Sequence, residues 1–283
     1  MPNNDQHAPL GWSLDRRNPN TIRSLMSIWE WLYQSYFRVQ TSGWQHIPTQ
    51  GQVLLVGSHN GGLAAPDMFM MMYDWFRRFG IERPTYGLMH PHVWQAIPAV
   101  AEVAEQCGAV VAHPKMAIAA LKRGASVLVY PGGAKDVFRP HALRNKIFLN
   151  GNQAFVRLAI AHQVPVVPAI SYGAHDTLIV LTDAYRYARK IHEEWGIPWF
   201  LDLDPQVFPI YLGIPWGLAI GPLPNLPFPV QIHTRICPPI EFEWTGHKAA
   251  RDREYVNECY NLVCAHMQQE LNDLVQTVEQ RRP

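Results

Sequence analysis

Apolar positions along the chain recur with periods that change from helical to strand-like and back. Between residues 21 and 39 they fall every three or four residues, which predicts an amphipathic helix. A second long stripe of this kind predicts a C-terminal helix over residues 250–279. We expect both helices to lie on the core. The aromatic residues Trp29, Trp31 and Tyr33 would also suit a helix at a membrane interface.

The centre of the chain alternates short apolar runs with helical patterns. The runs predict strands at 53–57, 85–89, 109–112, 126–130 and 164–170, and the patterns between them predict helices at 68–79, 93–103, 115–123 and 152–162. Apolar strands that alternate with helices are typical of an α/β fold whose sheet is covered on both faces. We therefore expect one α/β domain with a mostly parallel central sheet and amphipathic N- and C-terminal helices. Residues 1–20 are expected to form a loose polar arm, and residues 21–283 the domain.

Composition narrows the functional classes. Of the 283 residues, 48% are hydrophobic and 17% are charged, which suits a well-packed core. The formal net charge of +1 gives no basic field for nucleic acid. Cys107, Cys237, Cys259 and Cys264 have no metal-site spacing, so we expect reduced, packed thiols and a cytoplasmic protein. The first twenty residues are polar and do not resemble a signal peptide.

The longest apolar stretch runs from Val207 to Ile232 and contains six prolines. Repeated proline excludes a membrane-spanning helix, which needs about twenty uninterrupted apolar residues. We expect no transmembrane helix, and a flap that either packs on the core or dips into a membrane surface.

Two strand ends carry the candidate chemistry. The first strand is followed by His59-Asn60-Gly61-Gly62 and then Asp67, and the strand at 126–130 is followed by Pro131-Gly132-Gly133. Ligands of open α/β sheets bind at the carboxyl ends of strands. A neutral histidine can accept a proton near neutral pH, and a carboxylate can orient it. The glycines allow backbone N–H groups to turn toward a ligand.

A basic group follows the second strand end. Two readings of it stay open: a solvated charged loop, or a clamp for phosphate or pyrophosphate. Its members are Lys135, Arg139, Arg144 and Lys146. The chain has no motif for a dinucleotide, a P-loop, a zincin or a nucleophile elbow, and no metal site is expected. No serine, cysteine or threonine nucleophile accompanies His59, so direct attack by a substrate hydroxyl is favoured.

These motifs resemble the glycerolipid acyltransferase superfamily, and most closely its diacylglycerol-acyltransferase-like, or phytyl-ester-synthase-like, branch. The resemblance covers roughly residues 45–240 and rests on three blocks in the same order: His59-Asn60-Gly61-Gly62-Leu63 with Asp67, then Val127-Leu128-Val129-Tyr130-Pro131-Gly132-Gly133, then Val164-Pro165-Val166-Val167-Pro168 with Gly173-Ala174-His175-Asp176.

The resemblance implies roles for particular residues. His59 would be the catalytic base and Asp67 its charge partner, although eight residues separate them where the family motif has five. Gly61, Gly62, Pro131, Gly132 and Gly133 would bind the acceptor or the oxyanion. The block reads Tyr-Pro-Gly-Gly where phosphate-acceptor members carry Phe-Pro-Glu-Gly, which favours a neutral alcohol as acceptor.

The resemblance thus predicts an O-acyltransferase that moves a fatty acyl group to a neutral lipid alcohol such as diacylglycerol, phytol or a prenylquinol. The donor would be acyl-CoA or acyl carrier protein, whose phosphates the basic group would hold, and no bound cofactor is expected. The protein would act peripherally on a membrane surface. The alternatives are a lysophospholipid or glycerol-phosphate acyltransferase, a hydrolase, and a non-catalytic lipid-binding, membrane-associated protein.

Overall fold

A mostly parallel sheet forms the centre of the molecule. The computed structural model describes residues 8–96, 98–199, 202 and 204–281. The strand order is β1-β10-β6-β2-β5-β3-β4, with bounds β1 Gln40–Ser42, β2 Leu54–Gly57, β3 Thr85–Met89, β4 Ala109–Val111, β5 Ser126–Val129, β6 Val166–Tyr172 and β10 His233–Ile236. Strands β6, β2, β5, β3 and β4 pair in parallel, and β10 pairs antiparallel with β6. The expected α/β class is confirmed.

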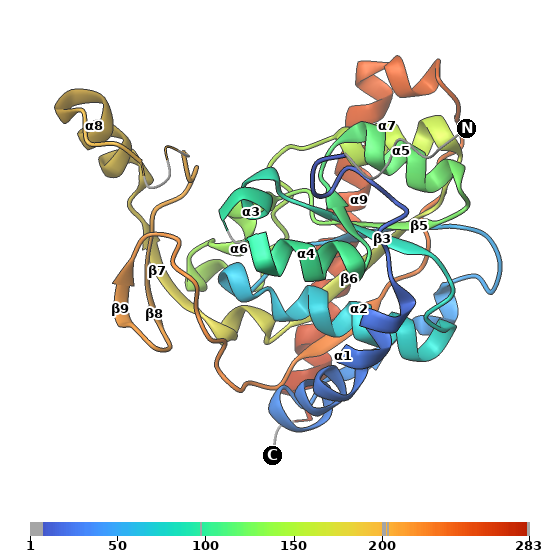
Figure 1. Ribbon diagram of the computed structural model, residues 1–283. Coiled ribbons are helices and arrows are strands. Elements are labelled where there is room, and N and C mark those ends of the chain that lie inside the picture. Colours follow the sequence, from blue (N-terminus) through green and yellow to red (C-terminus); the bar gives the residue numbers. More distant parts are fainter. Residues whose placement is uncertain (1–7, 97, 200–201, 203, 282–283) are drawn as a thin grey trace.

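Helices cover both faces of this sheet (Figure 1). Leu54 and Val56 of β2 pack in one cluster with helices α5 (Pro114–Lys122), α7 (Ala154–His162) and α9 (Arg253–Glu279). Leu55, between them, packs in the opposite cluster with α1 (Pro19–Trp31) and α2 (Pro66–Phe79). Because successive strand side chains point to opposite faces, an apolar run without alternation is what a doubly covered strand requires.

Two predicted helices have different bounds from those expected. The first begins at Pro19, capped by the Asn18 side chain, and ends as one π-helical turn at Leu32–Tyr36. The helix expected at 93–103 is divided into α3 (Pro91–Ala96) and α4 (Pro98–Gln106). Pro98 has no N–H to donate, so it begins a new helix more readily than it continues one.

The C-terminal helix is confirmed. Helix α9 begins at Arg253, where the Asp252 side chain accepts a hydrogen bond of 2.9 Å from Tyr255 N–H. Its buried residues follow the expected stripe: Val256, Cys259, Val263, Met267, Leu271, Leu274 and Val278.

The expectation of a loose polar arm is wrong from residue 8 onward. Gly11 N–H donates to Glu105 at 2.7 Å, the Tyr86 hydroxyl donates to the Leu14 carbonyl at 2.9 Å, and Leu14 is buried. Residues 1–7 lie outside the described part. Polar composition concealed this packing because a few apolar anchors and backbone hydrogen bonds hold the segment.

The four cysteines are free thiols in the described structure. Cys237 and Cys259 are buried, and burial raises the pKa of Cys107 to about 11. They are therefore packed and protonated at neutral pH, as expected.

A second, three-stranded antiparallel sheet stands at one side of the molecule. It consists of β7 (Ile179–Asp183), β8 (Pro209–Gly213) and β9 (Gly217–Ile220), and α8 (Tyr185–Trp195) follows β7. We call residues 179–199 and 204–226 the arm, since Figure 1 shows β7, β8, β9 and α8 projecting from the body. The flap expected at 207–232 thus supplies two paired strands. No helix in the described ranges is both long enough and apolar enough to cross a membrane.

Candidate functional site

His59 stands directly after β2, the strand that lies between β6 and β5 in the central sheet. All four residues of β2 are buried, so the strand is a rigid support. The chain then turns through Gly61, whose φ of 78° lies in the left-handed region. The His59 side chain keeps 18% of its surface exposed, whereas that of its neighbour Asp67 keeps 1%. This places one accessible imidazole at a carboxyl strand end, where sequence analysis expected it.

The structure brings Asp67 to His59. The eight-residue spacing is taken up by a short 3₁₀ turn at Gly62–Ala64, after which α2 starts at Pro66 with Asp67 in its first turn. His59 Nδ1 lies 3.5 Å from Asp67 Oδ1, and the carboxyl group is 1% exposed. This distance exceeds that of an ideal hydrogen bond. Asn60 Nδ2 donates to the other Asp67 oxygen at 3.1 Å, which fixes the carboxylate plane.

Tyr130 covers one side of the imidazole. The two ring centroids are 4.4 Å apart and the planes are inclined by 30°. The approach depends on Gly57, since a Cβ there would come within 2.3 Å of Tyr130 Cε1. Burial, together with the charges of Asp67 and Asp136, raises the pKa of the Tyr130 phenol well above its ordinary value. Tyr130 is therefore a neutral wall against which the His59 ring rests.

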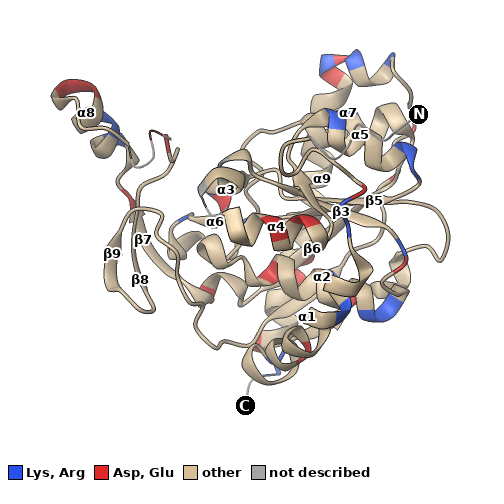
Figure 2. Ribbon diagram, in the orientation of Figure 1, with Lys and Arg blue, Asp and Glu red and all other residues tan. Residues whose placement is uncertain are grey.

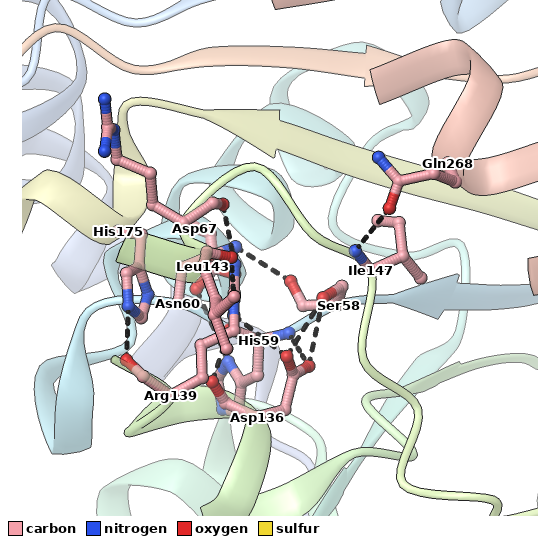
Figure 3. A network of polar contacts seen from close by, with 11 residues as sticks. Ser58, His59, Asn60, Asp67, Asp136, Arg139, Leu143, Ile147, His175 and Gln268 are labelled. Atoms are coloured by element: carbon pink, nitrogen blue, oxygen red, sulfur yellow. Dashed lines mark hydrogen bonds and ion pairs between the residues drawn. The ribbon is translucent and has the colours of Figure 1, made fainter. Parts of the chain in front are cut away.

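Asp136, on the short helix α6 (Gly133–Val137), anchors the His59 turn from below (Figure 3). Its carboxylate accepts hydrogen bonds from the His59 backbone N–H and, at 3.1 Å, from the Ser58 hydroxyl. Arg139 Nη1 lies 2.8 Å from Asp136 Oδ1. Burial raises the pKa of Asp136 to about 7, while the Arg139 charge and the two donated hydrogen bonds act in the opposite direction. Asp136 therefore positions His59 by holding the backbone N–H of the histidine.

Arg139 is buried, and its guanidinium is used entirely within the protein. It donates to His59 O (2.6 Å), Asn60 Oδ1 (2.6 Å), Asp136 Oδ1 (2.8 Å), Asp136 O (3.0 Å), Arg144 O (3.0 Å) and Leu143 O (3.1 Å). The expectation that Arg139 binds a donor phosphate is therefore wrong. A buried guanidinium with all its N–H groups occupied joins the histidine turn to the following loop instead.

The other three members of the basic group are at least partly exposed. Lys135 and Lys146 are exposed. Arg144 is 41% exposed, and its Nε lies 3.7 Å from Asp176. These three side chains remain candidates for the phosphates of an acyl donor, and that role stays a prediction.

His175 belongs to the support and not to the reacting groups. It is buried, and its Nε2 makes a 2.8 Å hydrogen bond with the Arg139 carbonyl oxygen. Burial and the neighbouring Arg139 charge lower the pKa of His175 to about 3. It is therefore neutral and donates the Nε2 proton to the carbonyl.

The glycines of the two strand ends have identifiable packing roles. A Cβ on Gly61 would come within 2.4 Å of Thr177 Oγ1, and one on Gly62 within 2.5 Å of Leu178 Cδ2. Gly132 is equally confined, since its Cβ would meet the Phe148 carbonyl oxygen at 2.2 Å. Gly133, with φ of 58°, has open space at its Cβ position. Pro131 is buried, and the Gly133 N–H donates to the Tyr130 carbonyl at 3.3 Å, so this N–H is not free for an oxyanion.

One protein-family model matches part of this chain. Residues 38–172 match the model of the Acyltransferase family. The matched segment contains β2, His59, Asp67 and the Pro131–Gly133 turn, so the acyltransferase resemblance in the sequence is confirmed at this level. The diacylglycerol-acyltransferase-like branch stays a prediction.

Individual proteins similar to this chain were also found. Uncharacterized protein Rv0502 of Mycobacterium tuberculosis is 29% identical over 215 residues, which are 72% of this chain and 56% of that protein. Uncharacterized protein ML2427 of Mycobacterium leprae is 29% identical over 194 residues, 68% of this chain and 49% of the relative. The chain thus spans about half the length of these curated relatives. The crystal structure of the 1-acyl-sn-glycerophosphate acyltransferase PlsC from Thermotoga maritima aligns with a TM-score of 0.46 and 16% identity, covering 93% of this chain and 80% of that one.

Sequence reasoning missed Asp136 as an anchor and misread Arg139. A weak signal was present: an aspartate and an arginine three residues apart directly after a strand-end turn can pair on one helical face. Asn225 was also missed. It is buried, neither of its amide atoms has a hydrogen-bond partner, and its Oδ1 lies 2.9 Å from the Cβ position of Gly62.

Proposed function

We propose that the protein is an O-acyltransferase that moves a fatty acyl group from an acyl thioester to the hydroxyl of a lipid alcohol. The observation that carries this proposal is the pairing of a partly exposed His59 with a buried Asp67 at 3.5 Å, inside the segment that matches the Acyltransferase family. The donor would be acyl-CoA or acyl carrier protein.

His59 Nε2 would take the proton of the acceptor hydroxyl as its oxygen attacks the thioester carbonyl carbon. Asp67, at Nδ1, would hold the imidazole in the required tautomer and stabilise the imidazolium. The tetrahedral intermediate then collapses, the C–S bond breaks, and the imidazolium returns the proton to the leaving thiolate. The Gly132 N–H is our candidate donor to the oxyanion.

A covalent acyl-enzyme has less support. Ser58, the hydroxyl residue next to His59, donates to both oxygens of Asp136 at 3.1 Å and so is oriented into the buried support. A covalent acyl-serine would first need the Ser58 hydroxyl to turn away from Asp136.

Asn225 is our candidate for contact with the acceptor. A buried amide without partners costs about 1–3 kcal/mol for each unsatisfied group, and such groups are rare in native structures. Its place beside Gly62 puts this polar group close to the His59 turn. Replacing Asn225 by Leu should raise the free energy of unfolding by about 1 kcal/mol while lowering kcat/KM for the acceptor. Urea unfolding and acceptor titrations measure the two effects; lower stability together with unchanged acceptor kinetics would contradict this role.

A neutral alcohol is the acceptor class that we propose. Gly132 stands where the phosphate-acceptor block has a glutamate, and Arg139 is engaged by internal contacts. Both features give a phosphate acceptor less support.

The test uses the purified chain, radiolabelled acyl-CoA and five separate acceptors: diacylglycerol, phytol, a prenylquinol, lysophosphatidate and glycerol 3-phosphate. We expect labelled ester with at least one neutral alcohol. Product with only the phosphate acceptors would overturn the acceptor class. Free fatty acid without any acceptor would indicate a hydrolase, and saturable binding without product would indicate a lipid-binding protein.

A further inference from the structure

The outward face of the small sheet is apolar where a water-facing sheet would be polar. Leu212 and Leu218 are directly opposite each other in the β8–β9 pairing, and Ile210 is opposite Ile220. Leu218 is 64% exposed and Ile220 56%. Antiparallel sheets with one solvated face normally alternate apolar and polar residues, and this one does not. The exposed ladder therefore has no explanation in the packing of the chain on itself.

The inner face of the same sheet is firmly attached to the candidate site. Val180, Tyr211 and Ala219 are buried in one cluster with Phe138, which lies between Asp136 and Arg139 in the chain. Leu178 of that cluster occupies the space that a Cβ on Gly62 would need. Whatever contacts the outer face is thus held at a fixed position relative to His59.

Helix α8 presents a second unpartnered apolar stripe. None of its residues is buried, and Tyr187, Ile191 and Trp195 follow one another at four-residue steps with exposures of 75%, 39% and 73%. Its charged residues include two ion pairs, Arg189 with Glu193 and Lys190 with Glu194, and Arg186 is a third basic residue, so basic residues exceed acidic ones by one. An amphipathic helix with exposed Trp and aliphatic residues and basic residues among its polar ones is typical of a helix that lies in a membrane interface.

Charge distinguishes the possible occupants. No Asp, Glu, Lys, Arg or His occurs from Val207 to Ile232, and Figure 2 shows β8 and β9 without a charged residue, while charge gathers on α8. An interface with a protein partner would normally have a polar rim and about ten direct hydrogen bonds. Hydrocarbon requires no such groups, and the small net positive charge of α8 suits anionic headgroups. The Trp216 Nε1–H donates a hydrogen bond of 2.7 Å to the Pro224 carbonyl oxygen. The exposed Trp216 ring can therefore enter an apolar phase without an unpaired donor.

We propose that the arm is a membrane-docking surface, in which the outer face of β7–β8–β9 and the apolar stripe of α8 insert into a lipid bilayer and hold the His59 site at its surface. The proposal rests on the proposed function in one respect: the lipid alcohol would be drawn from the bilayer that the arm contacts. The arm itself takes no part in the chemistry.

The test measures sedimentation of the full chain with sucrose-loaded vesicles of phosphatidylcholine and phosphatidylglycerol, without acyl donor. Leu218→Asp and Trp195→Asp, each made alone, should weaken vesicle partitioning about tenfold or more, since each replaces an inserted apolar side chain by a charge. Leu262→Asp is the matched control, because Leu262 is 54% exposed on α9, away from the arm, and should partition like the wild type.

Further outcomes decide between docking, chemistry and self-association. His59→Ala should bind vesicles like the wild type, because the arm takes no part in the chemistry. Protein that binds vesicles but forms no ester would contradict the proposed function and leave docking intact, so the two failures are distinguishable. Wild-type protein that does not sediment with vesicles, or arm variants that sediment as it does, would overturn docking. A wild-type dimer that Leu218→Asp converts to a monomer in analytical ultracentrifugation, without vesicle binding, would instead assign the face to a second copy.

Discussion

The ion pair between Asp136 and Arg139 gives the sharpest test of how the site is supported. Both side chains are buried, at 0% and 5% exposure. Removing one member of such a pair leaves the other charge without a partner and costs about 3–5 kcal/mol. Arg139→Met also leaves four carbonyl oxygens, those of His59, Asp136, Leu143 and Arg144, without this donor. We therefore expect the free energy of unfolding to fall by about 3–5 kcal/mol at pH 7.

The double variant Asp136→Asn/Arg139→Met shows whether the unpaired charge is the cause. It removes the charge but keeps an oxygen that can accept from the His59 N–H, so it should be more stable than Arg139→Met alone. Urea unfolding followed by circular dichroism measures the three free energies. Arg189→Met breaks an exposed pair with Glu193 and should change nothing measurable.

The pH dependence of Arg139→Met adds a second readout. Without the guanidinium, the largest effect that opposes burial is lost, so the pKa of Asp136 rises further above its ordinary value. A carboxyl whose pKa is raised on folding stabilises the protein at low pH, and that contribution is lost as the pH rises through the folded-state pKa. The variant should therefore lose stability from pH 6 to pH 8. A loss below about 1 kcal/mol at pH 7, or a double variant no more stable than the single one, would refute this reasoning.

Two further predictions concern the neighbours of this pair. Gly57→Ala should displace Tyr130 from His59, lower kcat about tenfold or more and cost about 1–3 kcal/mol of stability. Gly87→Ala is the control, because its Cβ would meet no atom within 4 Å, and it should change neither kcat nor stability. An unchanged kcat in Gly57→Ala would contradict the role of Tyr130 beside the imidazole. His175 has a folded-state pKa of about 3, below its ordinary 6.5, so its contribution is present above pH 6.5 and is lost as the pH falls. Stability should drop by about 2 kcal/mol from pH 7 to pH 5 through this group, and His175→Gln should remove that part of the slope in urea titrations.

Much of the central sheet could be predicted because its strands carry continuous apolar runs between turn residues. β2 is such a run, and the abrupt change to Ser58-His59-Asn60 marks the strand end that presents the imidazole. β1 and β10 could not be predicted, because strands as short and polar as Gln40–Ser42 and His233–Ile236 show neither alternation nor an apolar run. The arm was obscured for the opposite reason: apolar residues on both faces of β8 and β9, interrupted by proline, give no two-residue period.

The candidate site shows the same limit at the level of side chains. His59 and Asp67 are near in sequence, so their pairing could be anticipated from a turn between strand and helix. Asp136 lies 77 residues from His59, and only the three-dimensional structure shows that it accepts the His59 N–H. Arg139 was misread because a basic residue in a loop gives no indication of burial.

The central claim is that His59 is the base for acyl transfer. The most direct measurement is the steady-state rate of ester formation by His59→Ala with the acyl donor and whichever lipid alcohol the wild type accepts, alongside the unfolding temperature of the variant. His141→Ala is the matched control, because His141 forms a partly exposed pair with Asp176 at 2.7 Å that has no part in the proposed chemistry. We predict a fall of about 10²–10⁴-fold for His59→Ala with a near-native unfolding temperature, and near wild-type rates for His141→Ala. A His59→Ala variant that forms ester at the wild-type rate would contradict the account.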